Sequence, residues 1–335
     1  VLVLWFFVSV FTSVIFRPLC CLVDSLAAAQ LSALLLLFVA VFLYLEKRSR
    51  WQARFHHTSN RYSSLMQQQL TGGQAAFALL YCMTPLLLGF IVPVYFLLGW
   101  ALDAYAEVLD KEFYFLLLHS LSLAFVTALL ALMIALFMAY TNRNTRSYIN
   151  RFMVRFVSLG YAIPGTVIAV GVLIPFAWFD NSLDTLLSNR FGISSGLLIS
   201  GTLFTLIFAY LVRFLAVSIN TVEAGLTKIK PAMDEVAKTA GLLPFNIIKR
   251  IHIPMMRGSL LTALLLVFVD VMKELPATLI LRPFNFNTLA VRTYELANEE
   301  RLADAAVPAL AIVLAGIIPV ILISNSISNS RPGHE

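Results

Sequence analysis

The sequence is poor in charged residues. Only 13% of its 335 residues are Asp, Glu, Lys or Arg, and 60% are apolar, whereas soluble globular chains carry about 25% charged residues. So little charge cannot cover the water-facing surface of a chain of this length. This excludes an ordinary soluble enzyme and a disordered chain, and the composition predicts a membrane protein.

Cysteine and catalytic motifs are also scarce. The three cysteines, Cys20, Cys21 and Cys82, have neither metal-ligand spacing nor the even number of a disulfide framework, so we assign no metal site. The sequence has no G-x-x-x-x-G-K-[ST] phosphate-binding loop, no HExxH and no G-x-S-x-G. These absences predict a non-catalytic chain that binds no cofactor. The net charge of +6 comes without any nucleic-acid motif, and we expect no nucleic-acid partner.

Long apolar runs dominate what is present. A membrane-spanning helix needs about 20 mostly apolar residues. Seven segments meet this requirement: 26–45, 76–100, 113–140, 156–179, 191–212, 258–281 and 305–324. Residues 1–16 are apolar but too short to assign. The sequence therefore predicts an all-α polytopic membrane protein in contact with lipid.

The loops between these segments alternate in charge. Loops 46–61, 141–155 and 218–257 carry an excess of Lys and Arg, whereas loops 101–112, 181–190 and 282–304 are acidic or nearly neutral. Basic loops stay in the cytoplasm. Seven crossings then place the start of segment 26–45 outside and the tail, 325–335, in the cytoplasm.

The basic loop 218–257 is too long for a simple connector. Pro231 suits the first turn of a helix, and Gly241 suits the position just after its end. Pro244 begins a second short helix, which we expect Pro254 to stop. An apolar stripe on the first helix consists of Met233, Val236, Ala237 and Ala240. Exposed apolar surface of this kind indicates contact with a protein partner or with the membrane surface.

The spacing of this loop resembles the signature loop of ABC importer permeases. Glu235-Val-Ala237, three residues, Gly241, nine residues and Ile251-His-Ile253-Pro254 match the pattern E-A-A, three residues, G, nine residues, I-x-L-P. Val236 and Ile253 replace the usual alanine and leucine. The resemblance implies a coupling helix at about 243–250 that docks on a cytoplasmic ABC ATPase dimer, which uses the ATP. The motif residues are Glu235, Val236, Ala237, Gly241, Leu243, Pro244, Phe245, Ile251, Ile253 and Pro254. An amphipathic loop on the membrane surface is the alternative.

A second stretch of the sequence resembles one particular type of ABC importer permease. Residues 270–279, 281–286 and 288–295 are similar to the ferric-iron type of ABC importer permease, which usually fuses two six-helix halves. The resemblance implies a type I transmembrane domain at 76–324, preceded by a remnant of a first repeat at 1–45 and a basic linker at 46–75. Because the sequence begins inside an apolar run, we expect an N-terminally truncated member. The implied location is the bacterial inner membrane, with a periplasmic ferric-iron-binding protein as partner.

Other functions stay open at this point. Related permeases with the same loop carry thiamine, sulfate, phosphonates or polyamines. A chain of another class, a secondary transporter or a channel, would also be polytopic, although the coupling motif argues against it.

Three charged residues lie inside the segment 258–281. Asp270, Lys273 and Glu274 share one helix face, and charges at membrane depth usually face protein or water. Lys273 is expected to pair with Asp270 or Glu274, or the three line a translocation path. Pro276 is expected to kink the helix. Arg213 is expected to lie at the cytoplasmic end of its helix and to extend toward water.

Overall fold

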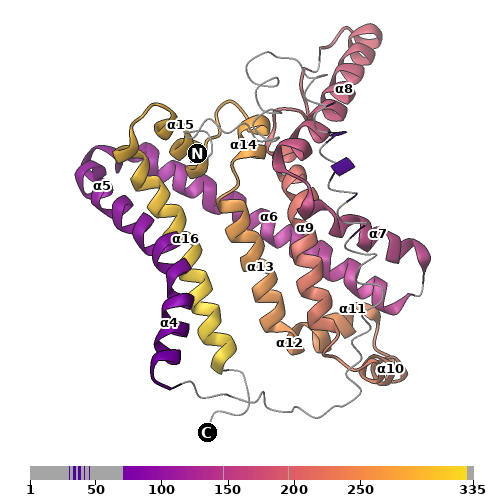
Figure 1. Ribbon diagram of the computed structural model, residues 1–335. Helices are drawn as coiled ribbons and strands as arrows, with labels where there is room; N and C mark the ends of the chain where they lie inside the picture. The colour runs from indigo at the N-terminus through magenta and orange to yellow at the C-terminus, as the bar shows by residue number, and fades with distance from the viewer. Residues whose placement is uncertain are drawn as a thin grey trace.

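In the computed structural model, residues 71–145, 147–194 and 196–329 are described, with side chains to residue 321, besides a few helical positions between 30 and 45. The described residues form helices without strands (Figure 1), so the expected all-α fold is confirmed. The elements are α4 (Gly73–Leu86), the π-helical turn η1 (Leu87–Ile91), α5 (Val92–Val108), α6 (Lys111–Asn144), α7 (Tyr148–Ser158), the 3₁₀ turn η2 (Gly160–Ala162), α8 (Gly165–Phe191), α9 (Leu203–Leu226), α10 (Pro231–Thr239), α11 (Pro244–Ile247), the π-helical turn η3 (Ile248–His252), α12 (Ile253–Met255), α13 (Arg257–Met272), α14 (Pro276–Leu281), α15 (Leu289–Asn298) and α16 (Leu302–Asn329).

Five helical stretches are long and apolar enough to cross a bilayer. They are Gly73–Val108, Lys111–Asn144, Gly165–Phe191, Leu203–Leu226 and Leu302–Ile321. A bent pair, Pro244–Met255 with Arg257–Met272, makes a sixth if it is counted as one span. The expected first span, 26–45, lies largely outside the described residues, as do residues 1–24 of the expected first-repeat remnant.

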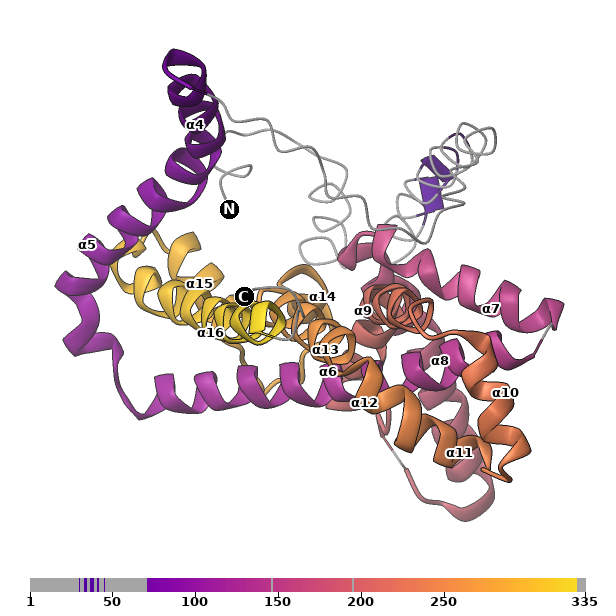
Figure 2. The ribbon, with the colours of Figure 1, turned by 90° about the horizontal axis from the view of Figure 1, so that it is seen from below.

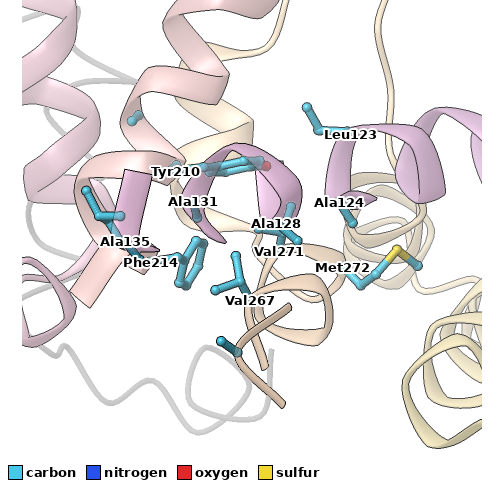
Figure 3. Packing of buried hydrophobic residues seen from close by; sticks show 14 of the residues in the cluster. Leu123, Ala124, Ala128, Ala131, Ala135, Tyr210, Phe214, Val267, Val271 and Met272 are labelled. Carbon is cyan, nitrogen blue, oxygen red and sulfur yellow. The ribbon is translucent and has the colours of Figure 1, made fainter. Parts of the chain in front are cut away.

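The core lies where α6, α9 and α13 pack against one another (Figure 3). Helix α6 contributes four alanines that are completely buried, spaced four, three and four residues apart: Ala124, Ala128, Ala131 and Ala135. Small side chains let neighbouring helices approach closely, and this matters in lipid because apolar burial provides little attraction between helices there. Tyr210 and Phe214 of α9 and Val267 of α13 fill the space beside this stripe.

A second group of helices flanks this core. Helix α5 packs along α16, α15 packs on α16, and α16 contacts α13. The α10–α12 segment lies at one end of the bundle, and α14 and α15 lie at the other (Figure 1). Seen along the bundle, α4 and α5 stand at its edge (Figure 2), with large apolar side chains such as Phe77 and Tyr95 exposed. An apolar outer surface is what a lipid-facing helix requires.

The expected span 156–179 is wrong in its bounds. The chain instead forms α7, the turn η2 and then α8, which begins at Gly165 and continues to Phe191. Ile163 has an extended backbone (φ −83°, ψ 130°), as expected of a residue that precedes a proline. Pro164 therefore separates the two helices.

The expected span 191–212 is displaced toward the C-terminus, to α9 (Leu203–Leu226). Gly192, Gly196 and Gly201 have positive φ values of 65°, 60° and 78°, which interrupt a helix. The carboxylate of Asp180, which is fully buried, accepts hydrogen bonds from the backbone N–H groups of Ile199 and Ser200. These bonds hold Ile199 and Ser200, which precede α9, against α8.

The expected span 258–281 is broken. Helix α13 ends at Met272 and α14 begins at Pro276. The proline ring clashes with the carbonyl of the residue four positions earlier, which is Met272, and its nitrogen has no hydrogen to donate. Pro276 thus causes a complete break rather than the expected kink, and Lys273 and Glu274 lie in the gap.

Candidate functional site

Helix α10 begins and ends where the sequence indicates. Pro231 lies in its first turn and Ala240 closes it. Gly241 follows with φ 77°, a left-handed conformation that favours glycine. The N–H groups of Gly241 and Leu242 donate to the carbonyls of Lys238 and Ala237, at 3.0 and 3.1 Å. This pattern satisfies the last carbonyls of the helix, so the prediction that Gly241 ends it is confirmed.

The second helix continues further than predicted. From Pro244 to Met255 the elements α11, η3 and α12 follow one another without a break. Pro254 lies in the first turn of α12, directly after the π-helical turn, where its missing N–H is tolerated. The expectation that Pro254 stops the helix is therefore wrong. The chain turns only at Met256, and the two helical parts meet at 85°.

The hairpin made by α10 to α12 exposes apolar side chains. Val236 and Leu243 are each 67% exposed and Phe245 is 71% exposed. Of the expected stripe, only Ala237 is buried, whereas Met233, Val236 and Ala240 are exposed. Among the other motif residues, Ile251 is half-buried, and the exposed ones are Glu235, Gly241, Pro244, Ile253 and Pro254. Apolar side chains presented to the outside indicate a surface for a partner.

A buried polar cluster lies behind this surface. The Nε atom of Arg143, in the last turn of α6, donates to Asp234 Oδ2 at 2.8 Å, and His252 Nε2 lies 2.6 Å from Asp234 Oδ1. Burial raises the pKa of Asp234, but the hydrogen bonds and positive charges of His252 and Arg143 outweigh it and hold this pKa below its usual value. Asp234 is therefore ionised at neutral pH.

The sequence did not single out this cluster. In the sequence, Arg143 is one of several basic residues of loop 141–155, and His252 occupies the variable position of the I-x-L-P part of the motif. Neither residue lies near Asp234 in sequence. The one available signal is the histidine itself, a polar residue between Ile251 and Ile253.

The charges inside the bundle form two ion pairs. Lys273 Nζ lies 2.8 Å from Asp270 Oδ1, one of the two partners expected for it. Glu274 Oε1 lies 2.7 Å from Arg213 Nη1, and Glu274 is only 6% exposed. Because α9 continues to Leu226, Arg213 lies in the middle of the helix, and the expectation that it lies at a helix end is wrong.

The Arg213–Glu274 pair lies where three elements meet. Glu274 Oε1 also accepts from the N–H of Ala277 at 3.2 Å, so it binds the first turn of α14. Gly165, the first residue of α8, is so close to the pair that a Cβ atom there would overlap both side chains. The ion pair thus joins α9, the start of α8 and the gap between α13 and α14.

Residues 131–331 match the family described as binding-protein-dependent transport system inner membrane component. The chain belongs to this family. Its apolar helices and this membership identify a multi-pass protein of the inner membrane. The family consists of membrane components of transport systems. Within the described residues, no group of three or more His, Cys, Asp or Glu is placed to hold a metal ion.

The names of the curated relatives mention two different solutes. The Fe(3+)-transport system permease protein FbpB 2 of Haemophilus influenzae is 26% identical over 319 residues, which cover 93% of this chain and 60% of that protein. The putative 2-aminoethylphosphonate transport system permease protein PhnV of Salmonella typhimurium is 26% identical over 219 residues, 65% of this chain and 76% of that protein. The chain thus spans less than two thirds of the iron permease's length.

Solved structures show the same fold. A bacterial alginate ABC transporter, crystallised in complex with an alginate pentasaccharide-bound periplasmic protein, matches with a TM-score of 0.58 and 17% identity. The match covers 77% of this chain and 94% of the other. The helical arrangement is therefore that of an ABC importer permease.

Proposed function

We propose that the chain is the membrane-spanning subunit of an ATP-driven importer, and that the α10–α12 hairpin is its contact with the ATPase. The observation that carries this proposal is the hairpin itself, in which the motif residues lie on an exposed helical projection. We refer to residues 231–255 as the coupling element. The ATPase dimer hydrolyses ATP, and this chain contributes no catalytic group.

Docking would bury the apolar face of the coupling element. Leu243 and Phe245 begin the second helix and are 67% and 71% exposed. Large apolar side chains that enter pockets supply most of the binding energy of an interface. The coupling element then lies on the cytoplasmic side, and so does the C-terminal tail.

The opposite end of the bundle faces the periplasm in this arrangement. Phe284, in the loop between α14 and α15, is fully exposed. Such a side chain on a loop suits an anchor for a solute-binding protein. A substrate-loaded binding protein would dock there while the ATPase acts at the other end.

The charged residues near the break in α13 are proposed to line the translocation path or its outer gate. Asp270 lies near the end of α13, Lys273 and Glu274 lie in the gap that follows it, and Arg213 of α9 pairs with Glu274. A gate needs contacts that differ between its two states. The Arg213–Glu274 pair supports such a role because it joins α9 to the break between α13 and α14.

Ferric iron is the proposed substrate. The support is the iron permease of H. influenzae, whose similarity extends over 93% of this chain. A hard cation prefers oxygen ligands, and Asp270 and Glu274 present carboxylates near the gate. The second candidate is 2-aminoethylphosphonate, because the putative permeases for that solute match 65% of this chain.

Two experiments test this function. In the first, the full chain is co-purified with an ABC ATPase of the same organism, and replacing Glu235 with Ala and Gly241 with Val abolishes ATPase retention. Intact retention by that variant contradicts the docking assignment, and uptake that needs no ATPase indicates a channel or secondary transporter instead. In the second, cells lacking other importers take up radiolabelled Fe(III) but not labelled 2-aminoethylphosphonate. The reverse preference overturns iron as the substrate.

A further inference from the structure

Arg143 connects three segments of the chain. Its Nη1 donates to the carbonyl oxygen of Leu226 at 2.5 Å and its Nη2 to that of Ile229 at 2.8 Å, while Nε binds Asp234. Leu226 is the last residue of α9, where the carbonyls have no partner within the helix. A single guanidinium at the end of α6 therefore closes α9 and holds α10.

His252 extends these contacts to the second helix of the coupling element. Its side chain is completely buried, and its ring lies against that of Tyr140 with centroids 5.4 Å apart. Tyr140 precedes Arg143 by one turn on α6. Both carboxylate oxygens of Asp234 are thus occupied, one by a group from α6 and the other by a group from η3.

The coupling element is joined to the bundle mainly by side chains. Helix α10 shares its main helix-to-helix contacts with α11 rather than with α6. Besides Arg143 and His252, a hydrogen bond from Lys238 to Asn144 reaches α6. A small apolar cluster of Tyr140, Ala237 and Ile247 completes the attachment.

We propose that Arg143, Asp234 and His252 are positioning residues that transmit the movement of the coupling element to α6 and α9. This inference rests on the proposed function and deepens it. Both oxygens of Asp234 are held by short hydrogen bonds to basic side chains, and bonds of this charge-assisted kind are strong, so a displacement of the hairpin carries the ends of α6 and α9 with it. The exposed face formed by Val236, Leu243 and Phe245 binds the ATPase separately, because none of these three side chains belongs to the network.

The test uses the full chain in complex with its ATPase in lipid nanodiscs. Spin labels are attached at Asn189→Cys on α8 and Glu299→Cys beside α15, after Cys20, Cys21 and Cys82 are replaced with Ser. The distance between the labels is measured without nucleotide and with ATP and vanadate, together with the ATPase rate. The variants are Asp234→Asn, His252→Leu and His252→Gln, and the matched control is Lys228→Gln, an exposed basic residue near the cluster.

The expected result separates docking from transmission. Asp234→Asn and His252→Leu retain the ATPase and hydrolyse ATP at rates within about twofold of wild type. In these variants, however, the fraction of molecules that adopt the ATP-induced distance between the labels falls at least tenfold. His252→Gln, which keeps a hydrogen-bond donor for Asp234, and Lys228→Gln both preserve the change.

Two results overturn the inference. One is an unchanged distance response in Asp234→Asn and His252→Leu. The other is loss of ATPase retention in these variants together with His252→Gln, which indicates that the cluster only maintains the fold. If the wild-type chain itself retains no ATPase, the proposed function falls and the inference falls with it.

Discussion

At the residue scale, a few polar side chains and glycines set the structure of an otherwise apolar chain. The ion pair of Arg213 and Glu274 and the network around Asp234 each join elements that are distant in sequence. Close packing adds a steric demand at particular glycines. Gly160 lies so near the backbone of α9 that a Cβ atom would overlap the carbonyl oxygen of Val212.

Gly160→Ala is therefore expected to destabilise the chain. Overpacking at a tight contact costs about 1–3 kcal/mol, and here the obstacle is backbone that cannot rotate away. The control is Gly171→Ala in α8, where no atom lies within 4 Å of the added carbon and replacement in a helix interior stabilises by about 0.5–1 kcal/mol. Thermal unfolding in detergent measures both, and equal melting temperatures contradict the packing described.

Glu274→Gln is expected to destabilise more than Lys273→Gln. Removing one partner of a buried pair costs about 3–5 kcal/mol, a figure to be reduced here because 22% of the Arg213 side chain is exposed. Lys273 is 62% exposed, and an exposed pair is worth about 0–1 kcal/mol. Thermal unfolding of both variants compares them. A larger loss in Lys273→Gln contradicts the assignment of the buried pair.

At the element scale, hydrophobic runs predicted that spans exist but not where they begin and end. Segment 113–140 lies within α6, and it contains no proline or glycine. Segment 305–324 lies within α16, which continues through Pro308 and Pro319. Pro164 sets the start of α8 and Pro276 sets the break after α13, because proline restricts the backbone. The start of α9 is set by the loop whose backbone N–H groups bind the carboxylate of Asp180. Apolar composition predicts neither effect. The coupling element was predicted from Pro231, Gly241 and Pro244, whose effects are local.

The polar clusters could not be predicted in the same way. Arg213 and Glu274 are 61 residues apart, and Arg143 and Asp234 are 91 residues apart. Charge pattern alone does not say which of several basic residues meets a given acid across a bundle. Arg213 meets Glu274 because α9 packs against α13, and Arg143 meets Asp234 because the hairpin places α10 beside the end of α6.

Two exposed phenylalanines allow the two ends of the molecule to be tested separately. Phe245→Ser is expected to weaken ATPase binding at least tenfold without changing thermal stability, because the side chain is 71% exposed. Phe284→Ser at the opposite end keeps ATPase binding but weakens binding of the solute-binding protein. Co-purification and surface plasmon resonance measure the two affinities. An effect of Phe284→Ser on the ATPase alone contradicts the assignment of the ends.

At the scale of the whole molecule, the basic loops and the helix order predict one arrangement in the membrane. In the arrangement we propose, the coupling element and the tail share the cytoplasmic side, and the α14–α15 loop lies in the periplasm. The bundle then has an ATPase-binding end and an end for the solute-binding protein. A chain in the opposite orientation cannot contact a cytoplasmic ATPase.

Cysteine labelling in intact cells checks this orientation. After the native cysteines are replaced with Ser, Glu299→Cys is expected to react with a membrane-impermeant maleimide added outside. Thr239 is also exposed, but Thr239→Cys reacts only after the cells are permeabilised. The opposite labelling pattern reverses the topology.

Photo-crosslinking from position 245 tests the central claim most directly. A photoreactive phenylalanine analogue replaces Phe245 in the full chain, cells are irradiated, and the products are identified by mass spectrometry, with position 284 as the control. We predict a covalent adduct between position 245 and a cytoplasmic ABC ATPase, and none with that ATPase from position 284. Crosslinks from position 245 to lipid alone would show that the hairpin lies on the membrane surface and would contradict the account.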